Sequence, residues 1–352
     1  MFGKPKGLIG LDIGSSAVKA VELKRKGSSY ELLNLGMESL GQDTVVDGAI
    51  MDALSVSDAI RKIFDQNKIK TKNVSTSVSG HSVIVKRITV AAATEDEVAN
   101  AISYEAQQHI PFDMAEVNLN YQVLGPGASE AGTAFDVMLV AVKREKILNH
   151  TNVLSSADKL AVVVDIDAFA LQNAFEANYD PPPDLMAALL NIGASIMNIN
   201  IVRGGIPLFT RDVSVGGNQY TDTLQKELDL SFEDAEKLKQ GQEVGNIPAD
   251  AKTPHLRSVS EILLLEIQKT FDFFRQTTST DNIQHIYVAG GTAKVEGLVD
   301  LLKEEFSIPV EVLNPFQKVA TNPSKFDPSY MSEIAPRMTL AVGLALRSFD
   351  TP

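Results

Sequence analysis

The chain has 352 residues, 44% hydrophobic and 22% charged, which is ordinary for a soluble globular protein of about two or three domain-sized units. It has no Cys, which excludes disulfides, thiolate metal sites and Cys nucleophiles. A formal net charge of −13 argues against nucleic acid or anionic lipid as a direct partner. The start has no signal-peptide pattern and no apolar run approaches the roughly 20 residues of a membrane span. We therefore expect an acidic, cytoplasmic protein.

The first half opens with a predicted meander of three strands, at residues 8–14, 17–23 and 30–38, joined by small-residue turns. A helix is predicted at 55–67, where apolar residues recur on one side, and a short strand at 74–78.

Residues 83–157 form a predicted separate unit, inserted between two similar halves. Thr94 and Glu97 have capping-box spacing at a helix start, and Pro111 is expected to end that helix. The other predicted elements are strands at 83–90, 116–124 and 135–142, a Gly-rich turn at 125–132 and a helix at 144–156.

The second half repeats the order of the first. Its predicted strands are 162–166, a hairpin within 187–202, 206–213, 285–289 and 310–313. Its predicted helices are 167–177, one opening at Gly216 and Gly217, one capped by Ser231, 255–275, one from about 295, and a terminal helix at 335–348 that returns to the first lobe. Strands alternating with helices, twice, indicate an α/β architecture with right-handed crossovers.

The two hairpins, at residues 8–23 and 187–202, have related sequences, and each carries a turn of small residues at its tip. Sliding one onto the other gives these pairs: Asp12 with Asn191, Gly14 with Gly193, and Ser16 with Ser195. Glycine at a tip allows backbone N–H groups to approach a ligand closely. A single tip of this kind is usually only a turn, but a duplicated one is typical of a symmetric two-lobed fold. Two tips that face each other would hold a phosphate chain between amides and hydroxyls.

Two further stretches are candidates for the same cleft. Residues 287–293, YVAGGTA, are a strand ending in paired glycines before a helix, where backbone can lie against a ring or phosphate. The alternative is a plain strand-to-helix turn. Glu236 and Lys239 share a helix face, either as a solvated pair or as groups contacting ribose and base.

Asp12 is the acid at the first tip, and one carboxylate plus phosphate oxygens can hold Mg²⁺, which keeps several waters. Asn191 stands where the repeat would place a second Asp, and an amide is no general base. We therefore expect nucleotide binding with slow or negligible hydrolysis. The five histidines have no close metal spacing, and there is no G-x-S-x-G elbow or P-loop.

The succession of these motifs resembles the actin-like ATPase superfamily, and within it the PilM family of type IV pilus assembly. The stretches that carry the narrower resemblance are EAQQHIPF at 105–112, LNYQVLG at 119–125, VDIDAFALQNA at 164–174 and APRMTLAVGLALR at 335–347. The resemblance implies an actin-like fold, two ribonuclease-H-like lobes around a nucleotide cleft with a small α+β domain inserted in the first lobe. It divides the chain into a first lobe (1–82, completed by 335–352), the insert (83–157) and a second lobe (158–334) with a helical nucleotide-contacting part at about 217–280.

The resemblance also implies an ATP-binding or ADP-binding scaffold that acts in pilus assembly and twitching motility. Its partner would be the cytoplasmic N-terminal tail of the membrane protein PilN, held in a groove between first lobe and insert, which would join it to the inner-membrane complex; self-association is compatible with it. Mg²⁺ would lie at Asp12 through water. The expected nucleotide-site residues are Asp12, Gly14, Ser15, Ser16, Lys19, Asn191, Gly193, Ala194, Ser195, Gly216, Gly217, Glu236, Lys239, Gly290, Gly291 and Thr292.

Two alternatives remain at this point. One is a filament-forming division protein similar to FtsA, which would be expected to carry an amphipathic anchor after a linker, whereas this sequence ends directly after the predicted terminal helix. The other is a sugar kinase of the same superfold, which needs a catalytic Asp in the first lobe for which no motif is evident, and fold alone does not establish function.

Overall fold

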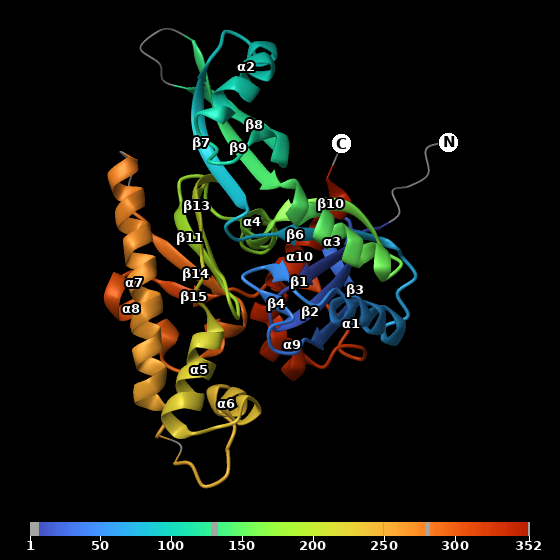
Figure 1. Ribbon diagram of the computed structural model, residues 1–352, viewed down its shortest axis with the longest axis vertical. Coiled ribbons are helices and arrows are strands. Elements are labelled where there is room, and N and C mark those ends of the chain that lie inside the picture. The colour runs from blue at the N-terminus through green and yellow to red at the C-terminus, as the bar shows by residue number, and fades with distance from the viewer. Residues whose placement is uncertain (1–6, 128–132, 249, 279–281, 351–352) are drawn as a thin grey trace.

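The computed structural model describes residues 7–127, 133–248, 250–278 and 282–350. Two lobes lie side by side and a small unit projects from one end (Figure 1). The first lobe is built on a six-stranded sheet in the order β10-β6-β1-β2-β3-β16, and the second on a five-stranded sheet in the order β13-β12-β11-β14-β15. No helix within the described ranges is both long and apolar enough to cross a membrane.

The sheet of the first lobe is covered by helices on both faces. Its strands are β1 (Ile9–Ile13), β2 (Ala17–Lys26), β3 (Ser29–Ser39), β6 (Asn73–Val78), β10 (Leu160–Ile166) and β16 (Val319–Ala320). On one face pack α1 (Ala53–Gln66) and α3 (Arg144–Ser156), and on the other α9 (Pro328–Ile334) and α10 (Thr339–Leu346). The Asp52 side chain accepts from the N–H groups of Leu54 and Ser55, both at 3.0 Å, and so caps α1.

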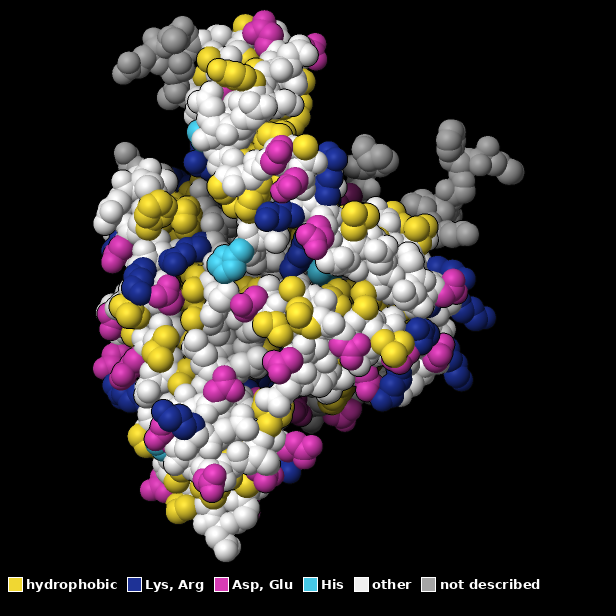
Figure 2. Space-filling model, viewed as in Figure 1, with side chains coloured by type: hydrophobic (Ala, Val, Ile, Leu, Met, Phe, Trp, Pro, Cys, Tyr) yellow, Lys and Arg dark blue, Asp and Glu magenta, His cyan; other side chains and the backbone are white. Residues whose placement is uncertain are grey.

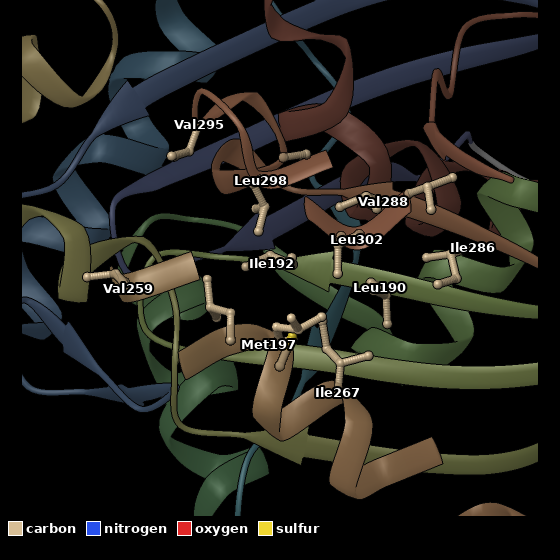
Figure 3. Packing of buried hydrophobic residues seen from close by; sticks show 14 of the residues in the cluster. Leu190, Ile192, Met197, Val259, Ile267, Ile286, Val288, Val295, Leu298 and Leu302 are labelled. Atoms are coloured by element: carbon tan, nitrogen blue, oxygen red, sulfur yellow. The ribbon is translucent and has the colours of Figure 1, made fainter. Parts of the chain in front are cut away.

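The second lobe repeats this plan, as the duplicated sequence predicts. Its strands are β11 (Met186–Ile192), β12 (Met197–Arg203), β13 (Ile206–Val213), β14 (His285–Ala289) and β15 (Val310–Val312). In each lobe the first three strands are antiparallel, and the first strand pairs in parallel with a later one, β6 or β14. Its helices are α5 (Gly217–Leu228), α6 (Phe232–Lys239), capped by Ser231, α7 (Thr253–Thr277) and α8 (Leu298–Phe306). Figure 3 shows the core that the strands share with α7 and α8.

The projecting unit is the predicted insert. It contains β7 (Val83–Ala91), α2 (Glu95–Gln107), β8 (Val117–Gly127) and β9 (Ala134–Lys143). The predicted cap is confirmed, because Thr94 Oγ1 accepts from the Glu97 N–H at 3.3 Å and the Glu97 carboxylate accepts from the Ala93 N–H at 2.7 Å. Residues 128–132 of the predicted Gly-rich turn lie outside the described residues.

The domain boundaries differ from those predicted. Strand β10 pairs with β6 in the sheet of the first lobe, and Val153 and Leu154 of α3 belong to the same core as Ile60 of α1. Residues 144–166 therefore belong to the first lobe, and not to the insert or to the second lobe. Strand β16 and helix α9, whose residues were predicted to lie in the second lobe, also belong to the first lobe, where they pack with α10. Compactness along the chain could not reveal these pairings, which join residues far apart in sequence.

Other predictions were wrong in detail. Helix α2 ends at Gln107, before Pro111. The helix expected from about 295 is a short 3₁₀ turn (Gly291–Lys294) followed by α8, and the terminal helix is α10 between two 3₁₀ turns (Ala335–Met338 and Arg347–Phe349). Helix α9 and the small hairpin of β4 (Val45–Val46) and β5 (Ala49–Ile50) were not predicted.

The two lobes meet along helix α4 (Asp167–Tyr179), which crosses α10 at very short range. A Cβ added at Gly343 of α10 would lie 1.8 Å from the Ala170 carbonyl oxygen of α4. On its other side α4 touches the second lobe, because Asn200 of β12 donates to the Ala168 carbonyl oxygen at 2.9 Å. The α4–α10 pair is therefore the joint on which the two hairpin tips are placed opposite each other.

Candidate functional site

The two hairpin tips meet across the lobes. Each tip is closed by its own backbone, since Gly14 N donates to Ala17 O at 3.1 Å and Gly193 N donates to Ile196 O at 2.9 Å. The Ser15 and Ser195 hydroxyl oxygens are 2.5 Å apart although the residues are 180 positions apart in sequence. The structure thus brings together the two turns that the repeat singles out, and a phosphate chain placed between them would replace this hydroxyl pair.

Below the first tip lies a nearly enclosed ion pair. Asp12 of β1 and Lys19 of β2 are register partners, and Lys19 Nζ donates to Asp12 Oδ2 at 2.7 Å. Their side chains are only 8% and 12% exposed. A Cβ added at Gly14 would lie 3.1 Å from Lys19 Nζ, so the ammonium lies directly beneath the turn. The first tip therefore holds an ammonium and a carboxylate side by side beneath the turn, a pair that an anion and a metal ion would have to share.

The second tip is tied to the start of α5 and to the turn after β14. The Gly193 carbonyl oxygen accepts from Gly217 N and from Thr292 Oγ1, both at 2.9 Å. The Ala194 carbonyl oxygen accepts from Asn218 N at 2.8 Å. Three of the stretches identified in the sequence therefore form one junction.

Two glycines are needed at this junction for packing reasons. Gly290 has φ +88°, and a Cβ there would lie 2.2 Å from the Ile192 carbonyl oxygen. A Cβ at Gly216 would lie 2.6 Å from the Gly193 carbonyl oxygen. At Gly290 the close approach is thus to protein backbone. The next residue, Gly291, faces a side chain, because a Cβ there would lie 3.5 Å from Arg337 Nε.

Glu236 and Lys239 lie beside the same junction. Lys239 Nζ donates to Thr221 Oγ1 at 2.8 Å, to the Gly217 carbonyl oxygen at 3.2 Å, and to Glu236 Oε1. The Lys239 side chain is 11% exposed, and burial is the main cause that lowers its pKa, with the charge of Arg337 adding to it. The pair is therefore not a solvated surface pair.

Asp167 is a residue of the cleft that sequence reasoning missed. It begins α4 directly after β10, and its Oδ1 accepts from Ser77 Oγ at 2.6 Å. Burial, and next the charge of Asp12, raise the pKa of Asp167 to about 6. The available signal was the VDID sequence, in which an acid follows an apolar strand at its C-terminal end and opens a helix.

The departure at Asn191 also has a structural context. Asn191 does not face a second acid at the tip. Its Nδ2 donates to Asn198 Oδ1 at 2.8 Å, and Asn198 Nδ2 donates to Asp212 Oδ1 at 2.8 Å. The amide is therefore held within the second lobe.

The described residues hold no group of three or more His, Asp and Glu side chains that could bind a metal ion by themselves. A Mg²⁺ ion at Asp12 would need phosphate oxygens and water as its other ligands. The donor set of one carboxylate fits that arrangement, which Mg²⁺ commonly adopts with nucleotides.

Two hollows flank the insert. One, of about 410 Å³, is lined by Ser103, Gln107, Met114, Val117, Asn118, Leu119 and Arg144. The other, of about 210 Å³, lies where insert, first lobe and second lobe meet, and its polar lining includes Gly80, His81, Asp167 and Asp212. On the face shown in Figure 2, acidic and basic side chains are interspersed and are not gathered into a patch of one sign.

Comparison with known proteins finds matches in sequence and in fold over nearly the whole chain. A family model described as type IV pilus assembly protein PilM matches residues 10–349. A solved structure described as a PilM–PilN type IV pilus biogenesis complex has a TM-score of 0.86 and 26% identity, over 99% of this chain and all of that one. Cell division protein FtsA of Streptococcus pneumoniae is 22% identical over 94% of this chain and 80% of its own length. MreB5 of Spiroplasma citri, solved with ADP, shares the fold at a TM-score of 0.52 and 13% identity, over 97% and 95% of the two chains. The chain has the actin-like ATPase fold.

Proposed function

Because the chain belongs to the PilM family of type IV pilus assembly proteins, we propose that it is a nucleotide-loaded scaffold of the pilus machinery. ATP or ADP, with Mg²⁺, would occupy the cleft between the lobes. The short cytoplasmic tail of PilN would bind between the first lobe and the insert. The protein would then be cytoplasmic and peripheral to the inner membrane through this partner.

The observation that carries the nucleotide proposal is the meeting of Ser15 and Ser195 at 2.5 Å. The hydroxyls of both tips converge there, above the ion pair of Lys19 with Asp12. Hydroxyl donors from both lobes, close to an ammonium, suit a phosphate chain. Glu236 and Lys239 lie at the far side of the same junction, where ribose and base would follow. Asp12 would hold Mg²⁺ through water, and the ion would neutralise phosphate charge.

Turnover is proposed to be slow or absent. Asn191 is a hydrogen-bond donor within the second lobe and supplies no base. Asp167, whose pKa is raised to about 6 by burial and by the charge of Asp12, is the candidate base for any hydrolysis. Release of phosphate from ATP by the purified protein measures this directly.

The tail site is proposed at the 410 Å³ hollow, which is formed by α2 and β8 of the insert together with Arg144. Arg144 is the first residue of α3, a first-lobe helix, so the hollow lies at the boundary where the groove is expected. Met114, Val117 and Leu119 give it an apolar lining, and Arg144 Nε donates to the Val117 carbonyl oxygen at 3.1 Å. The PilM–PilN complex in the comparison supports PilN as the occupant.

The test is a titration of a labelled PilN-tail peptide, with and without ATP, followed by fluorescence anisotropy. Ser103→Trp fills the hollow from an exposed position on α2 and should weaken binding at least about tenfold, the loss expected when an apolar side chain of the peptide stays exposed. Ser156→Trp, an exposed helix position at the end of α3, is the matched control. Equal affinity of both variants would refute this location, and absence of binding to the wild type would refute the partner.

An FtsA-like filament is a second candidate, favoured by the 22% identity to FtsA over most of the chain. Sedimentation with ATP and with lipid vesicles distinguishes the two. Polymers or direct vesicle binding by the protein alone would favour the filament. A protein that stays in the supernatant alone and pellets only with vesicles that carry PilN would favour the scaffold.

A further inference from the structure

A directed chain of hydrogen bonds links the second tip to the base of the insert. It crosses three adjacent strands in register, because Asn191 of β11 pairs with Asn198 of β12, and Asn198 pairs with Asp212 of β13. The two side-chain bonds are each 2.8 Å long. The chain ends at Gly80, whose backbone N–H donates to Asp212 Oδ2 at 2.6 Å.

Gly80 lies in the loop between β6 of the first lobe and β7 of the insert, with φ +87°. Two other contacts hold this loop to the second lobe. A Cβ added at Gly80 would lie 3.5 Å from Ile196 Cδ1, so the residue after Ser195 packs on the same glycine. Ser214 Oγ lies 3.3 Å from His81 Nε2. Beside them is the 210 Å³ hollow, which residues of the insert, the first lobe and the second lobe line together.

The direction of the chain explains why position 191 carries an amide. The Asp212 carboxylate accepts hydrogen bonds, so Asn198 must turn its NH₂ toward it and its oxygen toward position 191. Position 191 must then be a donor. An Asp there would leave Asn198 between two acceptors, and turning the Asn198 amide over only moves the unfavourable contact to Asp212.

We infer that Asn191 is a positioning residue. Its amide holds Asn198, Asn198 holds Asp212, and Asp212 holds the Gly80 N–H, so that the chain of bonds sets the insert against the second lobe. The same chain lets the occupancy of the tips alter the tail groove. The second half of this inference rests on the proposed function. A nucleotide that moves the second tip would shift β11 and β12, and the insert would follow through Gly80. The link is reciprocal, so a bound tail would change nucleotide affinity by the same factor.

Swapping the Asn at position 191 with the Asp at position 212, which conserves the net charge, tests the chain of hydrogen bonds itself, without nucleotide or partner. Asn191→Asp should speed hydrogen exchange of the Gly80 amide at least about tenfold, because one buried bond in the chain is lost. Adding Asp212→Asn should return exchange to within about threefold of wild type. In that double variant the Asn198 amide turns over and donates to the new carboxylate at position 191. Its oxygen accepts from the new amide at position 212, whose own oxygen accepts from Gly80. In Asp212→Asn alone, the Gly80 amide should also exchange slowly, because the side-chain amides of Asn191 and Asn198 can both turn over and so restore the chain.

The matched control is Asn152→Asp, the same chemical change at an exposed position of α3, which should leave Gly80 exchange unchanged. Unchanged exchange in Asn191→Asp, or failure of Asp212→Asn to restore it, would overturn the chain.

The coupling is measured as the ratio of PilN-tail Kd values with and without ATP. In wild type this ratio should differ from one. It should approach one in Asn191→Asp and return in the double variant. A ratio of one in a wild type that binds both ligands would overturn the coupling alone, whereas a wild type that binds neither ligand would refute the proposed function and leave the exchange result standing.

Discussion

Gly343→Ala tests the joint that sets the two tips against each other, and sequence and structure predict opposite signs for it. In a helix interior, Ala is more favourable than Gly by about 1 kcal/mol. In the structure a Cβ at Gly343 would lie 1.8 Å from the Ala170 carbonyl oxygen and 2.6 Å from its carbon. Both atoms belong to backbone, so no side chain can move aside.

The size of the effect follows from that overlap. Ordinary contact needs about 3.5 Å, so α4 and α10 would have to separate by more than about 1 Å. Separation of this size loosens packing along the whole crossing. Overpacking a close-packed core typically costs about 1–3 kcal/mol and occasionally more, and a clash with backbone that cannot move aside places Gly343→Ala above that range, at about 3–5 kcal/mol. Even after the gain in helix propensity, we expect a net loss of about 2–4 kcal/mol.

Urea unfolding followed by far-ultraviolet circular dichroism measures this loss. With a slope of about 3 kcal/mol per M, the midpoint should fall by roughly 1 M. Gly7→Ala, at a position with nothing within 4 Å of an added Cβ, is the control and should leave the midpoint unchanged. A midpoint for Gly343→Ala at or above that of the wild type would show that the helices do not cross as described.

Three further outcomes are expected. Gly290→Ala should cost about 3–5 kcal/mol because its Cβ would lie 2.2 Å from backbone, whereas Gly297→Ala, with φ +80° and open space around it, should cost only about 1 kcal/mol; equal urea midpoints would contradict this. ATP at about 100 times its Kd should stabilise the wild type by about 2.7 kcal/mol, and Asp12→Ala should lower that gain in thermal shift while the exposed Asp58→Ala keeps it. The pKa of Asp167 is about 6 in the folded protein against 3.8 for an unperturbed Asp, so ionisation of this carboxyl costs stability as pH rises through this window. The stability of Asp167→Asn should therefore gain up to about 2 kcal/mol relative to wild type between about pH 4 and 7. A difference in stability that does not change with pH would count against the buried carboxyl.

Local pattern predicted the parts of the fold that are fixed by neighbours in sequence. The meanders, the capped start of α2 and the tips at Gly14 and Gly193 follow from alternation, cap spacing and small residues, and all are found. The repeat predicted that the tips belong to equivalent positions of two lobes, and the contact between Ser15 and Ser195 agrees with it.

The features that the sequence could not predict depend on contacts between residues far apart in the chain. Nothing near β10 in the sequence shows that it pairs with β6, because the insert separates them. The role of Asn191 depends on Asp212, two strands away, and the raised pKa of Asp167 depends on burial and on Asp12. Glycine at 290 was expected for contact with a ligand, whereas the packing requirement found there comes from the backbone of Ile192.

Equilibrium binding of ATP to Ser15→Ala and to Ser195→Ala tests most directly whether the two lobes share one phosphate chain. Each hydroxyl that bonds a phosphate contributes about 1.5–3 kcal/mol, so each substitution should raise the Kd about 10- to 100-fold, while Ser28→Ala, in an exposed turn of the same first sheet, should leave it unchanged. An ATP affinity that depends on only one tip, or on neither, would contradict the account.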